Sequence, residues 1–186
     1  MDLREAIKGR RSVRSFEDLP VPRETVQELI NTGIYAPTGS NMQPWGFAVV
    51  EDKQLMQKWS DRAKELMLSV IDEKPQLQRY KALLENKEFN IFHGASCLLL
   101  IYGSTTSTNY IYDCSMVAQN IMLAAYEKGI GSCWIGFATA LGNLPDIKEI
   151  LNVPGDYNLV APLVLGYPRR KHAVVPRKEP VMFNWI

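Results

Sequence analysis

Ala36-Pro37-Thr38-Gly39-Ser40-Asn41-Met42-Gln43-Pro44-Trp45 is a polar loop that joins a helical pattern to an apolar, strand-like run beginning at Gly46. Pro37 disfavours helical backbone angles at the residue before it, and Gly39 permits a positive φ. The polar side chains of this short segment offer several hydrogen-bond donors and acceptors. We interpret it as a binding loop. An ordinary helix-to-strand connection is the alternative interpretation.

The composition predicts one domain, residues 1–186, because a chain of 186 residues with 46% hydrophobic content can bury a substantial core. The net charge is +1, from 21 basic and 20 acidic residues, so we expect neither nucleic acid nor a membrane as a partner. The first residues are charged and lack a signal-peptide core, and no apolar run approaches the ~20 residues that span a bilayer. We therefore expect a cytoplasmic protein.

The cysteines and histidines argue against several kinds of site. Cys97, Cys114 and Cys133 are odd in number and lack CxxC spacing, so we expect no disulfide framework. His93 and His172 have no metal-ligand spacing, and we predict no metal site. No GxSxG motif is present to supply a serine nucleophile.

The hydrophobic periodicity predicts more helices than strands. Helices are expected at residues 3–8, 22–36, 53–71, 77–84, 110–128 and 144–151, and extended segments at 46–50, 95–102, 130–136 and 159–167. Because the helices do not alternate regularly with the strands, the pattern favours an α+β layered domain over a doubly wound sheet. The charged stretch 72–93 is interpreted as a mobile or substrate-covering segment.

Two apolar features suggest a second subunit. The helix at 110–128 is apolar nearly all round, so it must be enclosed either by a partner or by its own domain. The tail at 168–186 ends in Met182, Phe183, Trp185 and Ile186, which is more apolar than a disordered tail would be. We expect this tail to dock on the partner subunit.

Arg10, Arg11, Ser12 and Arg14 form a compact set of guanidinium and hydroxyl donors near the start of the chain. Charge-assisted hydrogen bonds from such groups suit a phosphate. Arg177 and Lys178 in the tail are candidates to approach the same anion. A solvated charged face is the alternative interpretation of this cluster.

The run from Gly129 to Gly136 resembles a dinucleotide fingerprint only in composition. A Rossmann fingerprint follows a strand and opens a helix, whereas this run follows a helix and enters an extended segment. We interpret it as a backbone wall against a flat ligand, with packing of a buried strand as the alternative. Since no catalytic pair, metal set or activated nucleophile emerges, any catalysis is expected to depend on a bound organic cofactor.

Four motifs in order resemble the flavin-dependent nitroreductase family. They are Arg10-Arg11-Ser12-Val13-Arg14, the loop at 36–45, the stretch from Asp113-Cys114-Ser115 through Gln119-Asn120 to Gly131-Ser132-Cys133-Trp134-Ile135-Gly136, and Leu165-Gly166-Tyr167-Pro168. The resemblance implies a three-layer α-β-α fold with a mixed, mainly antiparallel central sheet. It also implies an intertwined homodimer with two FMN molecules at the subunit interface.

The resemblance assigns roles to individual residues. Arg10, Arg11, Ser12 and Arg14 would hold the FMN phosphate, ribityl chain and pyrimidine edge, with Arg177 or Lys178 adding to the phosphate site. The other subunit would line the isoalloxazine with Pro37, Thr38, Gly39 and Asn41. Cys133, Trp134, Ile135 and Gly136 would lie behind the ring.

The implied activity is a ping-pong reaction in which NADH or NADPH reduces FMN and a small aromatic acceptor, such as a nitroaromatic or a quinone, then takes the electrons. The sequence contains no motif that selects between the two donors. A flavin-binding or sensing protein with little turnover remains an alternative, as does a flavin-fragmenting or dehalogenating relative.

Overall fold

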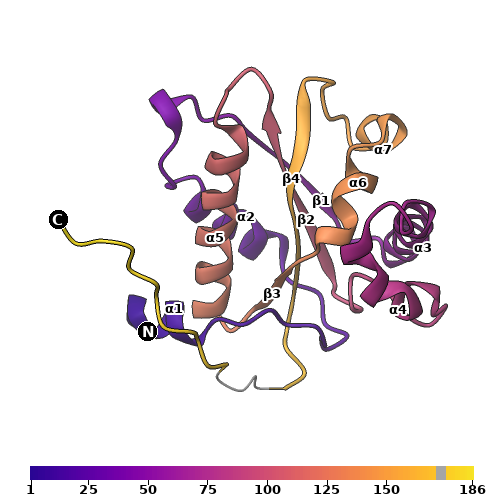
Figure 1. The fold of residues 1–186 in the computed structure, drawn as a ribbon, viewed down its shortest axis with the longest axis horizontal. Coiled ribbons are helices and arrows are strands. Elements are labelled where there is room, and N and C mark those ends of the chain that lie inside the picture. Colours follow the sequence, from indigo (N-terminus) through magenta and orange to yellow (C-terminus); the bar gives the residue numbers. More distant parts are fainter. Residues whose placement is uncertain (171–174) are drawn as a thin grey trace.

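The computed structural model describes residues 1–170 and 175–186. Four residues of the predicted C-terminal tail, including His172, lie outside the described residues. The architecture is built on one sheet whose strands follow the order β1-β2-β4-β3 (Figure 1). The strands are β1 (Trp45–Val50), β2 (Cys97–Ser104), β3 (Gly131–Trp134) and β4 (Tyr157–Gly166). All three ladders between these strands are antiparallel, and a parallel pairing occurs in the isolated bridge between Ser12 and Ser132.

Helices cover both faces of the sheet (Figure 1). One face carries α1 (Leu3–Gly9), α2 (Arg23–Gly33) and α5 (Tyr110–Glu127), and the other carries α3 (Lys53–Ser69), α4 (Lys81–Glu85), α6 (Thr139–Gly142) and α7 (Pro145–Ile150). Short 3₁₀ segments lie at Gly39–Asn41, Pro75–Tyr80 and Gly136–Ala138. The three-layer α+β architecture predicted from the sequence is confirmed.

The central strand β2 explains why two helical layers form. Every residue of β2 is buried, and its side chains alternate between two core clusters. Leu98, Leu100 and Tyr102 join the cluster with α3, whereas Leu99 and Ile101 join the cluster with α5. Because successive side chains of a strand point to opposite faces, a strand that is apolar throughout needs cover on both sides.

The structure departs from the sequence-based expectation in the loop after α2. That helix ends at Gly33, before Pro37, and two turn hydrogen bonds continue the chain to Ala36. The positive φ expected at Gly39 occurs instead at Ser40, Asn41 and Gln43. Gly39 has a different role, because a Cβ there would lie 2.6 Å from Asn109 Nδ2 and would force that amide to move.

One of the two interpretations of α5, enclosure by its own domain alone, does not hold for part of the helix. Ile111, Tyr112 and Met116 are exposed in the single chain, with Tyr112 at 69% of its full accessible area. The described part of the tail is also exposed and extends away from the body of the protein in Figure 1, with Phe183 at 98%. Contiguous exposed apolar surface is typical of an interaction site. Among the described residues, no helix is long and apolar enough to cross a membrane.

Tyr102 offers a test of how β2 is tied to α6. Its ring is buried, and its hydroxyl donates to the Gly142 carbonyl at 2.9 Å. Tyr102→Phe removes the donor but keeps the ring, so we expect the free energy of unfolding to fall by about 1–2 kcal/mol in urea titrations. Tyr35→Phe, at an exposed tyrosine, is the matched control and should change it by less than about 0.5 kcal/mol. Equal stabilities of the two variants would contradict this account.

Candidate functional site

The arginine segment runs beside the edge strand β3. The Val13 N–H donates to the Ser132 carbonyl at 2.9 Å, and Ser12 and Ser132 form a parallel bridge. Gly131 allows this close approach, because a Cβ there would lie 2.8 Å from Val13 Cγ2. Residues 12 and 13 are therefore held against the edge strand β3 by backbone contacts. Arg10 and Arg14 lie just before and just after this anchored pair in the chain.

The end of α5 sets the position of β3. Gly129 has φ +74°, and the Ile130 N–H donates to the Ala125 carbonyl at 2.8 Å, which closes the helix with a Schellman motif. The chain then enters β3 directly, so that Trp134 packs on the α5 side of the sheet and Cys133 on the opposite side. This glycine ends the helix that the sequence predicts at 110–128.

Positive charge gathers around Cys133. Burial lowers the pKa of the Arg10 guanidinium, and the charges of Arg11 and Arg177 lower it further. Burial also raises the pKa of the Cys133 thiol. The charge of Arg14, a hydrogen bond with Ser12 and the charge of Arg10 each lower this pKa. Several guanidinium groups thus repel one another at one place, an arrangement that a bound anion would stabilise.

The Arg11 side chain bonds to the backbone near the end of α1. Its guanidinium donates to the carbonyls of Lys8 and Arg10, both at 2.7 Å. These bonds satisfy carbonyls at the end of α1 and its junction with the arginine segment, which is a structural role that the sequence did not predict. Its charge still contributes to the field at Arg10.

A polar group without a partner lies beside the cluster. Ser132 is 2% exposed, and its hydroxyl has no hydrogen-bond partner among the described residues. Ser132 lines a cavity of about 430 Å³ together with Arg10, Arg11 and Arg170. An orphaned hydroxyl next to several guanidinium groups fits the oxygen atoms of a phosphate, so the residues present suit a phosphorylated cofactor. Sequence reasoning did not place Ser132 among the site residues.

A second cavity opens beside Arg14. It measures about 510 Å³, and its polar lining includes Asn90 and His93. Burial lowers the pKa of His93 to about 4, and the charge of Arg14 lowers it further, so the imidazole is neutral at pH 7. Neither residue carried a signal in the sequence, because their proximity to Arg14 arises from the fold.

The predicted ring-facing residues 134–136 continue from β3. The Ile135 N–H donates to the Pro162 carbonyl at 2.8 Å, which holds this backbone against β4. Gly136 is exposed, and a Cβ built on it meets no atom within 4 Å. The backbone at Gly136 therefore faces open space, as a wall against a flat ligand requires.

The loop that carries Pro37, Thr38, Gly39 and Asn41 lies far from this cluster. The Gly39 N–H donates to Asp113 Oδ1 at 3.2 Å, which ties the loop to the first turn of α5. The arginine segment meets the last turns of α5, where a Cβ on Gly9 would lie 2.1 Å from the Tyr126 hydroxyl oxygen. At ~1.5 Å rise per residue, Asp113 and Tyr126 lie about 20 Å apart along the helix axis. Figure 1 shows the violet loop and α1 at opposite ends of α5.

Known proteins share this fold. A relative in Methanothermobacter thermautotrophicus, whose name proposes NADH dehydrogenase/NAD(P)H nitroreductase activity, is 28% identical over 169 residues, covering 90% of this chain and 78% of the relative. A nitroreductase with bound FMN from Desulfitobacterium hafniense is 26% identical with a TM-score of 0.82, covering 97% of each chain. Oxidised iodotyrosine deiodinase bound to FMN and 3-iodo-L-tyrosine is 26% identical with a TM-score of 0.78, covering 100% of both chains.

The structure is an α+β fold with a guanidinium cluster beside an edge strand of its sheet. The model of the nitroreductase family matches residues 7–167, so the chain belongs to the nitroreductase family. The resemblance and the oxidoreductase class expected from the sequence are confirmed.

The neutral state of His93 predicts a dependence of stability on pH. Its pKa is about 4 in the folded chain and ~6.5 when unfolded. The unfolded chain therefore binds a proton that the folded chain rejects, and the free energy of unfolding should fall as the pH falls from ~6.5 to about 4. His93→Asn, which also tolerates positive φ, should weaken this dependence in urea titrations. Parallel curves for the two proteins would contradict the assignment.

Proposed function

We propose that the protein is an FMN-dependent oxidoreductase that takes hydride from NADH or NADPH and reduces small flat acceptors, such as nitroaromatics or quinones, by a ping-pong mechanism. The observation that carries this proposal is the cluster of Arg10, Arg14 and Arg177 around the backbone of β3. Membership of the nitroreductase family, the FMN bound in solved neighbours and the NAD(P)H in a relative's name support it.

The chain's own residues divide the binding task. Arg10, Arg177 and the orphaned Ser132 hydroxyl would hold the phosphate, with Arg11 adding its charge. Ser12 and Arg14 would hold the ribityl chain and the pyrimidine edge. The backbone of residues 133–136 would lie behind the ring.

The chemistry would come from the cofactor rather than from a side chain. Burial raises the pKa of Cys133, so the thiol remains protonated at neutral pH and is a poor nucleophile. When bound, FMN would supply a ring that accepts hydride and passes electrons on to the acceptor. The protein's part is to hold that ring and to leave its outer face open to donor and acceptor in turn.

The separation of the two predicted half-sites supports a homodimer with shared sites. Gly39 contacts the first turn of α5 and Gly9 its last turns, about 20 Å away. The loop with Pro37, Thr38, Gly39 and Asn41 is therefore far from its own Arg10, and a partner's loop would complete each site. The exposed apolar residues of α5 and the exposed C-terminal tail would supply the contact between subunits. We propose that the tail at 168–186 docks on the partner subunit.

Reductive dehalogenation is the second candidate. The full-length likeness to iodotyrosine deiodinase favours it over fragmentation of the flavin. Steady-state assays with NADH or NADPH and, in turn, nitrofurazone, menadione and 3-iodotyrosine separate the candidates. Turnover of the first two compounds supports the main proposal, and iodide release supports the second. No acceleration above free FMN with any acceptor would identify a flavin-binding protein with little turnover.

The guanidinium cluster predicts which side chains control cofactor binding. Arg10→Ala with Arg14→Ala should raise the FMN dissociation constant at least ~10-fold, because each charge-assisted bond to FMN contributes about 1.5–3 kcal/mol. Quenching of FMN fluorescence measures this constant. Arg4→Ala, at an exposed arginine on α1, is the matched control and should bind FMN normally. Normal affinity in the double variant would return the cluster to its alternative interpretation as a solvated face.

The shared site predicts complementation between two inactive chains. One chain carries Arg10→Ala and Arg14→Ala, and the other carries Gly39→Val, whose side chain would collide with Asn109 and displace the loop. Random reassortment of dimers restores about a quarter of the wild-type sites, because only a mixed dimer combines one intact cluster with one intact loop. FMN content after co-refolding measures the recovery. A mixture that binds no more FMN than its two parents would place the whole site within one chain.

A further inference from the structure

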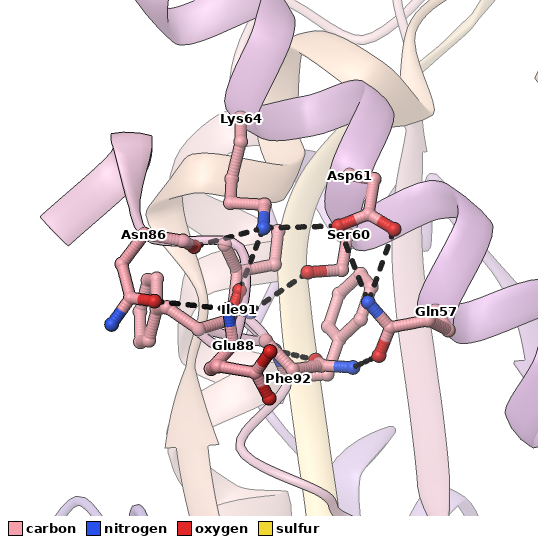
Figure 2. A network of polar contacts seen from close by, with 10 residues as sticks. Gln57, Ser60, Asp61, Lys64, Asn86, Glu88, Ile91 and Phe92 are labelled. Atoms are coloured by element: carbon pink, nitrogen blue, oxygen red, sulfur yellow. Dashed lines mark hydrogen bonds and ion pairs between the residues drawn. The ribbon is translucent and has the colours of Figure 1, made fainter.

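Lys64 on α3 is a buried lysine with a complete set of partners. Its side chain is 7% exposed, and the ammonium donates to the Phe89 carbonyl at 2.9 Å and to the Asn86 carbonyl at 3.3 Å. It also pairs with Asp61 at 3.0 Å, as Figure 2 shows. An ammonium is costly to bury, so its retention here indicates a role in fixing the backbone at residues 86–89.

Other side chains on the same face of α3 hold the rest of that segment. The Ser60 hydroxyl accepts from the Ile91 N–H at 2.9 Å, and Asn90 Nδ2 donates to Gln57 Oε1 at 2.7 Å. The Gln57 amide in turn donates to Asp61 (Figure 2). Hydrogen bonds and an ion pair therefore connect Lys64 through Asp61 and Gln57 to Asn90. Residues 86–91 are thus hydrogen-bonded to the middle two turns of α3, residues 57–64.

The segment of residues 86–91 leads directly to His93 in the candidate site. The Phe89 ring meets the His93 ring edge-on, with centroids 5.7 Å apart, and His93 has φ +57°. His93 and Asn90 line a cavity of about 510 Å³. Other residues of its lining are Arg14, Lys53, Asp18 and Arg169. The ammonium of Lys64 is therefore linked through the Phe89 backbone and ring to the imidazole beside Arg14.

We propose that Lys64 is a positioning residue of the cofactor site, which holds Phe89 and through it His93 beside Arg14, where the imidazole and the guanidinium together meet the polar edge of the bound flavin ring. This proposal rests on the proposed function. His93 is suited to such contact because its neutral imidazole offers one donor and one acceptor. The guanidinium of Arg14 supplies only donors, so the pair is complementary to a ring edge that carries both kinds of group.

Lys64→Met tests the proposal, because methionine keeps the apolar stem and removes the three donors. Lys58→Met, at an exposed lysine of α3, is the matched control. The first readout is the pKa of His93 by NMR, with His172→Gln in the background so that one histidine is observed. We expect this pKa to rise from about 4 towards ~6.5 in Lys64→Met, as the imidazole leaves its buried place beside Arg14. The second readout is the FMN dissociation constant, which should rise about tenfold.

A purely structural role for Lys64 gives a different result. It would lower the melting temperature while leaving the His93 pKa and the FMN affinity of the folded protein unchanged, and that outcome would overturn the proposal. If Lys64→Met does not fold, Phe89→Leu keeps the Lys64 contacts and breaks the step to His93. The same two readouts should then move, and unchanged values would refute the link. A wild-type protein without FMN affinity would refute the proposed function, whereas the His93 pKa tests the positioning separately.

Discussion

The hydrogen bond from the Val13 N–H to the Ser132 carbonyl is the contact on which the candidate site depends. It joins the N-terminal segment to the edge strand β3, and Gly131 permits the approach because any side chain there would collide with Val13. The sheet edge then fixes Arg10, Ser12 and Arg14 around Cys133. Without that anchor, repulsion between the guanidinium groups would favour their separation into solvent. The sheet thus maintains an arrangement of like charges that a bound anion would stabilise.

The long helix α5 separates the parts of the site as well as supporting them. Its first turn holds the loop through Asp113, and its last turns contact Gly9 and lead through the Gly129 cap into β3. A rigid helix of this length keeps the two predicted half-sites apart within one chain. Its exposed apolar side chains, Ile111, Tyr112 and Met116, lie in the first two turns, at the end that holds the loop. The apolar surface that would bind a second chain therefore lies at the loop end of the helix, away from the arginine segment.

Most of the fold could be predicted from the sequence because periodicity and capping are local properties. The continuous apolar run of β2, the amphipathic pattern of α3 and the glycine after α5 each act within a few residues, and the corresponding elements form as expected. Other features could not be predicted from the sequence, because they are too short to show a pattern or depend on contacts between distant residues. The helix α6 is too short to show a period. The role of Gly39 is set by Asn109 on a distant part of the chain, and the positive φ falls on its neighbours.

For the candidate site, the sequence by itself determined which chemical groups are available. The guanidinium groups at 10, 11 and 14, the polar loop after α2 and the glycine-bounded run at 129–136 were all evident as motifs. Only the tertiary structure decided which of them meet. It joined Arg10 and Arg14 to Cys133, added Ser132, Asn90 and His93, and placed the loop of residues 37–41 at the far end of α5. The physical reason is that a motif fixes backbone and chemistry locally, whereas proximity between motifs follows from the packing of helices on a shared sheet.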